Sequence, residues 1–174
     1  VITFSNSPPV AEDFTISIAE DSLPTGNNGI IDFSSHISDP DITAGISQTL
    51  TVQLLSLPSP SSNGALTSGQ SPYGAVSIGS IQGTVLRYNL TQPLSGRGNV
   101  TFSYQVSDGT DQGNAISNRG TVTIVITPVA HAPILAISPT SFTVNAGSSA
   151  VSLSGSITDY DGQTVNLYAV ATNI

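Results

Sequence analysis

The sequence predicts an all-β protein built as an antiparallel β-sandwich, and three observations predict it. Short stretches in which apolar and polar residues alternate recur along the chain, separated by clusters of Gly, Pro, Asn and Ser. The apolar residues are mostly Val, Ile, Leu and Ala, with no Trp, Met or Cys, and such side chains suit two sheets packed face to face. No stretch shows the 3.6-residue period of a capped helix.

Each alternating stretch has the length of a half-buried strand. The predicted strands are "DFTISIAE" (13–20), "QTLTVQLLSL" (48–57), "AVSIGSIQ" (75–82), "TVLRYNL" (84–90), "VTFSYQVSD" (100–108) and "GTVTIVITPV" (120–129). Turn-forming clusters separate them at 24–29, 58–64, 93–98 and 108–113. About seven strands in roughly 120 residues is the spacing of an antiparallel sandwich.

Comparison of the chain with itself indicates a repeat. "VITFSNSPPVAEDFTISI" (1–18) and "VTIVITPVAHAPILAISPTSFTV" (122–144) both run from a strand through a proline-flanked break into a new strand. We therefore expect residues 1–7 to be the last strand of a preceding repeat or an N-terminal extension. Residues 8–130 would form one complete domain, and residues 131–174 a linker and the first half of a second copy. A half sandwich leaves unpaired edges, so the chain is either part of a longer repeat protein or is completed by another copy.

The charge balance excludes several partner classes. Eleven acidic residues face three arginines, which gives a formal net charge of −8. Nucleic acids and anionic membrane surfaces both require basic patches, so neither is an expected partner, and no apolar run is long enough for membrane insertion. Only 8% of the residues are charged, and the hydroxyl-rich surface that remains is common on extracellular and cell-surface proteins. Clustered carboxylates favour a cation as the partner.

Two Asp-x-Asp pairs stand about one domain length apart, in "ISDPDI" (37–42) and "ITDYDG" (157–162). Calcium takes six to eight oxygen ligands, and two aspartates at positions i and i+2 of a loop can supply several of them. The same sequences are also good turn formers, because aspartate side chains accept hydrogen bonds from their own backbone. Both interpretations stay open at this point.

Several segments taken in order resemble the bacterial cadherin-like and Ig-like tandem-repeat surface adhesin domains. They are "PPVAEDFTISIAEDS", "ISDPD", "GTVLRYNL", "VTFSYQVSDG" and "TVTIVITPVAHAP". The resemblance covers residues 8–133 well and the remainder weakly. It implies an Ig-like sandwich, one of a series strung head to tail in a large cell-surface protein, with calcium at the junctions between domains.

The resemblance also implies which residues bind calcium. In the first copy these are Asp39 and Asp41, with Glu20 and Asp21 from the "ED" pair; Asp159 and Asp161 are their counterparts in the second copy. The second junction departs from the family pattern. The linker reads "AHAP" (130–133) where the family often has "NDAP", and "NAGSSA" (145–150) replaces the "ED" pair. The family pattern therefore favours calcium at the first junction over the second.

The remaining residues with reactive side chains form no catalytic pattern. His36 and His131 lie in no zinc or catalytic spacing and are interpreted as ordinary loop or strand-end histidines. No nucleophile elbow, phosphate-binding loop or carboxylate pair in a cleft is visible, so an enzyme is not expected. Asp108 is interpreted as a turn cap, with a metal role as the alternative. Asn89 ("NLT") and Asn99 ("NVT") are candidate glycosylation acceptors.

The leading hypothesis from the sequence is a non-enzymatic, extracellular cadherin-like repeat that acts as a calcium-stiffened structural or adhesive stalk. Its partners would be adjacent repeats or copies of itself, and surface glycans are a further option. The first alternative is a self-assembling filament or sheath subunit whose half domain is completed by a strand of a neighbouring copy. The second is a carbohydrate-binding module with Tyr73, Tyr88 and Tyr104 as its platform, although the same tyrosines are also expected to fill the core.

Overall fold

A computed structural model of the chain describes residues 5–20, 29–69, 74–91, 98–110 and 113–138, and beyond them 140, 141, 143, 145, 147, 154–159, 161 and 164–168. The chain divides into two compact units, unit 1 (Val1–Pro128) and unit 2 (Val129–Ile174). The division follows Pro128, two residues before the predicted boundary between 130 and 131. The structure of each unit follows separately.

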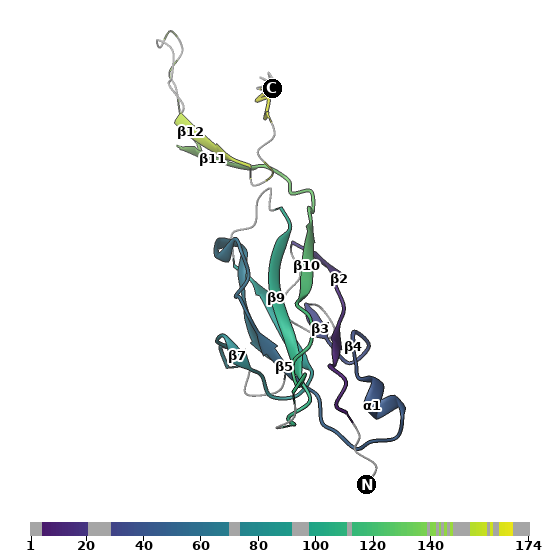
Figure 1. The fold of residues 1–174 in the computed structure, drawn as a ribbon. Helices are drawn as coiled ribbons and strands as arrows, with labels where there is room; N and C mark the ends of the chain where they lie inside the picture. The colour runs from purple at the N-terminus through teal and green to yellow at the C-terminus, as the bar shows by residue number, and fades with distance from the viewer. Residues whose placement is uncertain are drawn as a thin grey trace. The chain divides into compact units, whose positions relative to one another are not determined.

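Unit 1 contains a five-stranded sheet whose strands lie in the order β2-β10-β9-β5-β7 (Figure 1). Strand β2 pairs in parallel with β10, and the other pairings in this sheet are antiparallel. The strands are β2 (Phe14–Ala19), β5 (Thr51–Leu54), β7 (Gly79–Ser80), β9 (Val100–Ser107) and β10 (Gly120–Thr127).

A second, antiparallel sheet of unit 1 has the order β3-β8-β6, and β1 and β4 form a separate antiparallel pair. Two short helices complete the described part of the unit. These elements are β1 (Val10–Ala11), β3 (Ile30–Asp32), β4 (Ile37–Ser38), α1 (Pro40–Thr43), the 3-10 helix η1 (Ser61–Asn63), β6 (Gly64–Ser68) and β8 (Val85–Leu90).

The two larger sheets share one core, which gives unit 1 a sandwich-like all-β structure. Strands β9 and β10 bury alternate side chains, as a strand with one face on a core must. The buried side chains of this core come from both sheets and include Ile31, Val52, Leu54, Leu86, Tyr88, Val100, Phe102, Tyr104, Val106, Val122, Ile124 and Ile126. The prediction of an all-β chain is confirmed.

Four predicted strands match β2, β8, β9 and β10 closely, and 48–57 contains β5. The stretch 75–82 contains only the two residues of β7. Neither β3 nor β6 was predicted, and one helical turn, α1, interrupts the segment that follows β4. Residues 1–4, predicted as a strand, lie outside the described residues.

Unit 2 contains an antiparallel pair of strands, β11 (Ile134–Ser138) and β12 (Ser154–Thr158). Every residue of both strands is exposed. Across the residues that the structure describes, no helix has the length and apolar character needed to cross a membrane.

Candidate functional site

The first aspartate corner, Asp39 and Asp41, forms where β4 ends and α1 begins. Asp39 has extended backbone and caps the helix, because its Oδ1 accepts a hydrogen bond from the Asp41 amide at 2.7 Å. Pro40 occupies the first helical position, where its missing N–H leaves no unpaired donor. The sequence "DPD" therefore folds locally into a capped helical turn that fixes both aspartates.

Asp41 joins this corner to the segment that enters the unit. Its Oδ2 accepts a hydrogen bond from the Ser7 amide at 2.8 Å, and its Oδ1 accepts one from the Ser7 hydroxyl at 3.1 Å. Ser7 lies just before β1, so these two bonds hold the entry segment against the corner. Only 8% of Asp41 is exposed.

A third aspartate belongs to the same end of the unit. The side-chain Nδ2 of Asn6 donates to Asp108 Oδ2 at 2.9 Å. Gln48 Nε2 donates to Asn6 Oδ1, also at 2.9 Å. The backbone and hydroxyl of Thr110 both donate to Asp108 Oδ1 at 2.9 Å. Burial raises the pKa of Asp108, but the hydrogen bonds from Thr110 and Asn6 outweigh it and hold the pKa below its ordinary value.

One carboxylate oxygen of the corner has no hydrogen-bond partner among the described residues. Asp39 Oδ2 is buried without a hydrogen bond, and the Asp39 residue is only 2% exposed. Gln48 Oε1, from the neighbouring network, is also buried without a hydrogen bond. Among the described residues, neither Asp39 nor Asp41 forms an ion pair with an arginine. The corner thus gathers negative charge that no cationic side chain of the described residues balances.

The described residues of unit 1 contain no group of three Asp, Glu or His side chains whose ligand atoms all lie within 4.8 Å of one another. A cation at the first aspartate corner would therefore combine carboxylates with amide or backbone carbonyl oxygens. Hard cations such as calcium accept that mixture.

Glu20 does not belong to this corner. It follows β2, and its amide donates to the carbonyl of Thr127 at the end of β10. Asp41 instead contacts Ser7, which precedes β1. The six residues of β2 lie between these two places, and a strand of that length spans about 20 Å. In Figure 1, α1 lies at one end of unit 1 while β2 and β10 run towards the other. Asp21 lies outside the described residues.

The second aspartate corner, Asp159 and Asp161, repeats the geometry of the first. Asp159 Oδ1 accepts a hydrogen bond from the Asp161 amide at 2.7 Å, and Asp161 Oδ2 accepts one from the His131 amide at 2.6 Å. The strand pairs beside the two corners share one register: Val10 pairs with Ser38 in unit 1, and Ile134 pairs with Thr158 in unit 2.

His131 takes the place that Ser7 has in the first corner. Its Nδ1 lies 2.7 Å from Asp161 Oδ1, where the Ser7 hydroxyl contacts Asp41. This bond lowers the pKa of Asp161, and the His131 amide lowers it further. His131 was interpreted from the sequence as an ordinary loop histidine. Its pairing with Asp161 was missed, although its position three residues before β11, like that of Ser7 before β1, carried the signal.

The remaining candidates are placed as follows. His36 stacks on Phe14 with ring centroids 4.0 Å apart, and its Nδ1 lies 3.9 Å from a Glu12 carboxylate oxygen. Tyr88 and Tyr104 are buried in the core, so neither ring is available to stack on a sugar. Burial raises the pKa of Tyr104 to about 12. Tyr73 lies outside the described residues.

The two candidate glycosylation residues differ in accessibility. Asn99 is exposed and lies just before β9. Asn89 lies within β8, and its side-chain amide donates to the Thr67 hydroxyl on the neighbouring strand at 2.9 Å. Of the two, Asn99 is the more accessible acceptor.

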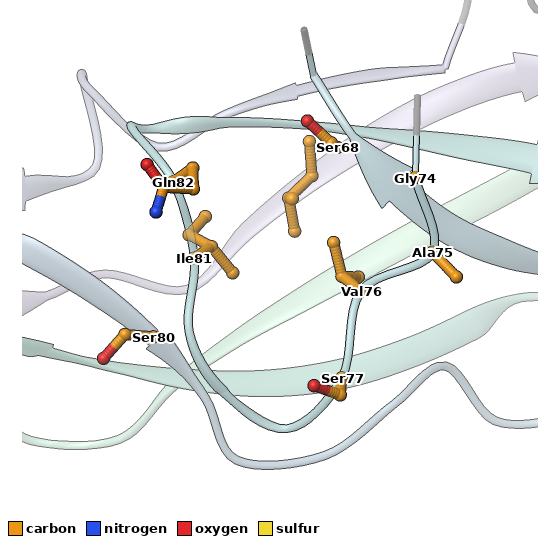
Figure 2. A pocket seen from close by; sticks show the side chains of 9 residues that line it. Ser68, Gly74, Ala75, Val76, Ser77, Ser80, Ile81 and Gln82 are labelled. Carbon is orange, nitrogen blue, oxygen red and sulfur yellow. The ribbon is translucent and has the colours of Figure 1, made fainter. Parts of the chain in front are cut away.

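A cavity of about 250 Å³ opens between β6, β8 and the segment around β7 (Figure 2). The side chains of Val76 and Ile81 face into it. Its lining is apolar, hydroxyl and amide in character, and no described lining residue is charged: Ser68, Gly74, Ala75, Val76, Ser77, Ser80, Ile81, Gln82 and Leu86. The described lining of the cavity can therefore make apolar contacts and hydrogen bonds, but it contains no carboxylate, no histidine and no basic side chain.

Comparison of the chain with protein-family models, curated proteins and solved structures finds no match.

Proposed function

We propose that this chain is a non-enzymatic extracellular repeat of the cadherin-like, Ig-like type, in which calcium bound at the first aspartate corner stiffens the junction where one repeat enters the next. The repeat serves as a structural or adhesive stalk at a cell surface. The observation that carries the proposal is the buried, unpartnered Asp39 Oδ2 beside the buried Asp41 carboxylate.

The energetics of burial support a cation here. A buried polar atom without a hydrogen bond costs about 1–3 kcal/mol, and more when it is charged. Asp39 and Asp41 are both buried, and no arginine balances them among the described residues. Calcium would satisfy the free oxygen of Asp39 and reduce the repulsion between the two carboxylates.

The position of the corner supports a role in stiffening. Asn6 and Ser7 belong to the segment that leads into unit 1, and their side chains reach Asp108 and Asp41. A cation held by Asp39 and Asp41 would restrict this entry segment through the Ser7 bonds. The repeated geometry at Asp159 and Asp161 supports the same arrangement at the entry to unit 2.

The composition supports an extracellular location. The sequence is rich in hydroxyl-bearing residues, and only 8% of the residues are charged. Millimolar calcium outside cells matches the weak to moderate affinity of extracellular calcium modules.

Thermal unfolding with and without calcium tests the proposal. Calcium at about 100 times its dissociation constant would stabilise the folded chain by about 2.7 kcal/mol, so we expect the melting temperature to rise by several degrees relative to a chelator. The substitutions Asp39→Asn and Asp41→Asn should each remove most of this rise.

Asp32→Asn is the matched control, because Asp32 is exposed and its carboxylate accepts hydrogen bonds from Ser34 in a local turn. This variant should keep the full calcium response. A melting temperature that is the same in calcium and in chelator would show that the corner is a metal-free anchor for the entry segment.

A second candidate function is assembly through unit 2. The exposed strands β11 and β12 favour it, because they carry apolar side chains with no covering sheet among the described residues. This candidate does not depend on calcium.

A further inference from the structure

The β11–β12 pair of unit 2 is the structural counterpart of the β1–β4 pair of unit 1. In unit 1, Ala11 pairs with Ile37, and the Glu12 amide donates to the His36 carbonyl. In unit 2, Leu135 pairs with Ile157, and the next pair joins Ala136 to Ser156. An aspartate corner follows β4 and β12 alike, so the two pairs can be compared position by position.

In unit 1 this pair is covered by β9. Strand β1 contacts β9, and Ala11 is only 2% exposed. The Tyr104 hydroxyl donates to the Glu12 carbonyl at 2.7 Å and lies 3.3 Å from the His36 carbonyl. The Tyr104 ring is fully buried. In unit 1, Tyr104 of β9 therefore covers Glu12 and His36. In unit 2 the same two positions are occupied by Ala136 and Ser156.

In unit 2 no described element covers the pair. Leu135, the counterpart of the buried Ala11, is 46% exposed, and Ile157 is 37% exposed. A shallow, open depression lies against the pair, lined by residues 136–138 and 154–156, which include the counterparts of Glu12 and His36. The apolar surface that β9 covers in unit 1 is thus present in unit 2, with a hollow beside the positions that Tyr104 reaches.

The β11–β12 pair and β9 are both uncharged, so no electrostatic repulsion opposes packing of a β9-like strand on the pair. Neither "ILAIS" (134–138) nor "SGSIT" (154–158) contains a charged residue, and neither does β9, "VTFSYQVS" (100–107). Exposed strands usually carry charged residues that discourage pairing with other chains. Their absence here favours docking of a neutral, apolar strand.

We propose that the β11–β12 pair is a docking surface for a neutral, tyrosine-bearing β segment of the β9–β10 type, with the tyrosine seated beside Ala136 and Ser156. The occupant is a strand pair presented by a partner repeat, because β9 of unit 1 is already paired on both sides, with β10 and with β5. This inference concerns apolar packing and is separate from calcium binding.

The test uses the whole chain and a synthetic peptide of residues 98–128, which carries β9 and β10. Hydrogen–deuterium exchange should show slower exchange of the amides in 134–138 and 154–158 when the peptide is added, with calcium or with chelator. A peptide with Tyr104→Ala should bind about tenfold more weakly or worse, since it lacks both the ring and the hydroxyl.

Two chain variants locate the docking surface. Leu135→Asp should abolish the protection, while Ile78→Asp, which changes an equally apolar residue that is 62% exposed on unit 1, should leave it unchanged. The melting transition of unit 1 should stay the same in both variants, which separates loss of docking from loss of folding.

Three outcomes would overturn the proposal. The first is no added protection of β11 and β12 at millimolar peptide. The second is equal protection by the Tyr104→Ala peptide, which would indicate nonspecific apolar adhesion. The third is concentration-dependent self-association that protects β11 and β12 without peptide, which would make a second copy of unit 2 the occupant.

Discussion

Asp39 illustrates how one residue serves a local and a larger role. One of its carboxylate oxygens caps α1, which the sequence "DPD" encodes within three residues. The other oxygen is buried and unpartnered. Its environment depends on segments far away in the chain, so the sequence indicated an aspartate corner but not which oxygen is free.

Asp108 yields a prediction about pH. Its hydrogen bonds with Thr110 and Asn6 hold its pKa below the ordinary value in the folded state. A group of this kind stabilises the fold above its unfolded pKa of about 3.9, and that contribution is lost as the pH falls through the lower folded pKa. Asp108→Asn should therefore cost about 1–2 kcal/mol at neutral pH and progressively less below about pH 4.

Urea unfolding of the wild type and Asp108→Asn across this pH range measures the effect. The pKa of Asp32 is lowered chiefly by the Ser34 amide, but Asp32 is exposed. Asp32→Asn should therefore reduce the free energy of unfolding at neutral pH much less than Asp108→Asn does. An Asp108→Asn deficit that stays constant from neutral pH to pH 3 would contradict the assigned role of the carboxylate.

Gly120 yields a prediction about packing. A Cβ at this position would lie 2.6 Å from Tyr104 Cε1 and 3.1 Å from the Glu12 carbonyl oxygen. Gly120→Ala should therefore displace the Tyr104 ring and destabilise unit 1 by about 1–3 kcal/mol. Gly113→Ala is the control, because nothing lies within 4 Å of its added Cβ. Chemical denaturation of both variants decides the matter, and equal stabilities would show that Tyr104 is not closely packed.

At the scale of elements, the strands predicted most closely are those that alternate over six or more residues in the structure itself. Strands β2, β8, β9 and β10 meet that condition. Strands β3 and β6 do not, since "IID" and "GALTS" form strands only because β8 pairs with both of them. Helix α1 was missed because a helix of one turn is fixed by its cap and not by a period.

The candidate site was predictable only in part. The Asp39 and Asp41 pair stands out in the sequence because two acids flank one proline. The contact of Ser7 with Asp41 and that of Asn6 with Asp108 do not, since they join residues 34 and 102 positions apart. Glu20 was grouped with the corner by family resemblance, but the length of β2 places it elsewhere.

At the scale of the whole molecule, the internal repeat is the strongest organising feature. The same strand register, the same Asp-x-Asp bond and the same contact from an entry residue occur in both units. Ser7 and His131 differ chemically at that shared position. Because imidazole nitrogen is a poor ligand for hard cations, calcium should prefer the first corner to the second.

The central claim is that the first aspartate corner binds calcium, and calorimetric titration of calcium into the whole chain tests it most directly. We expect saturable binding in the range of extracellular calcium modules, with a dissociation constant of about 0.1–1 mM. That binding should weaken at least tenfold in Asp39→Asn and stay unchanged in Asp32→Asn. Absence of calcium-dependent heat in the wild type, or identical titrations for the wild type and Asp39→Asn, would contradict the account.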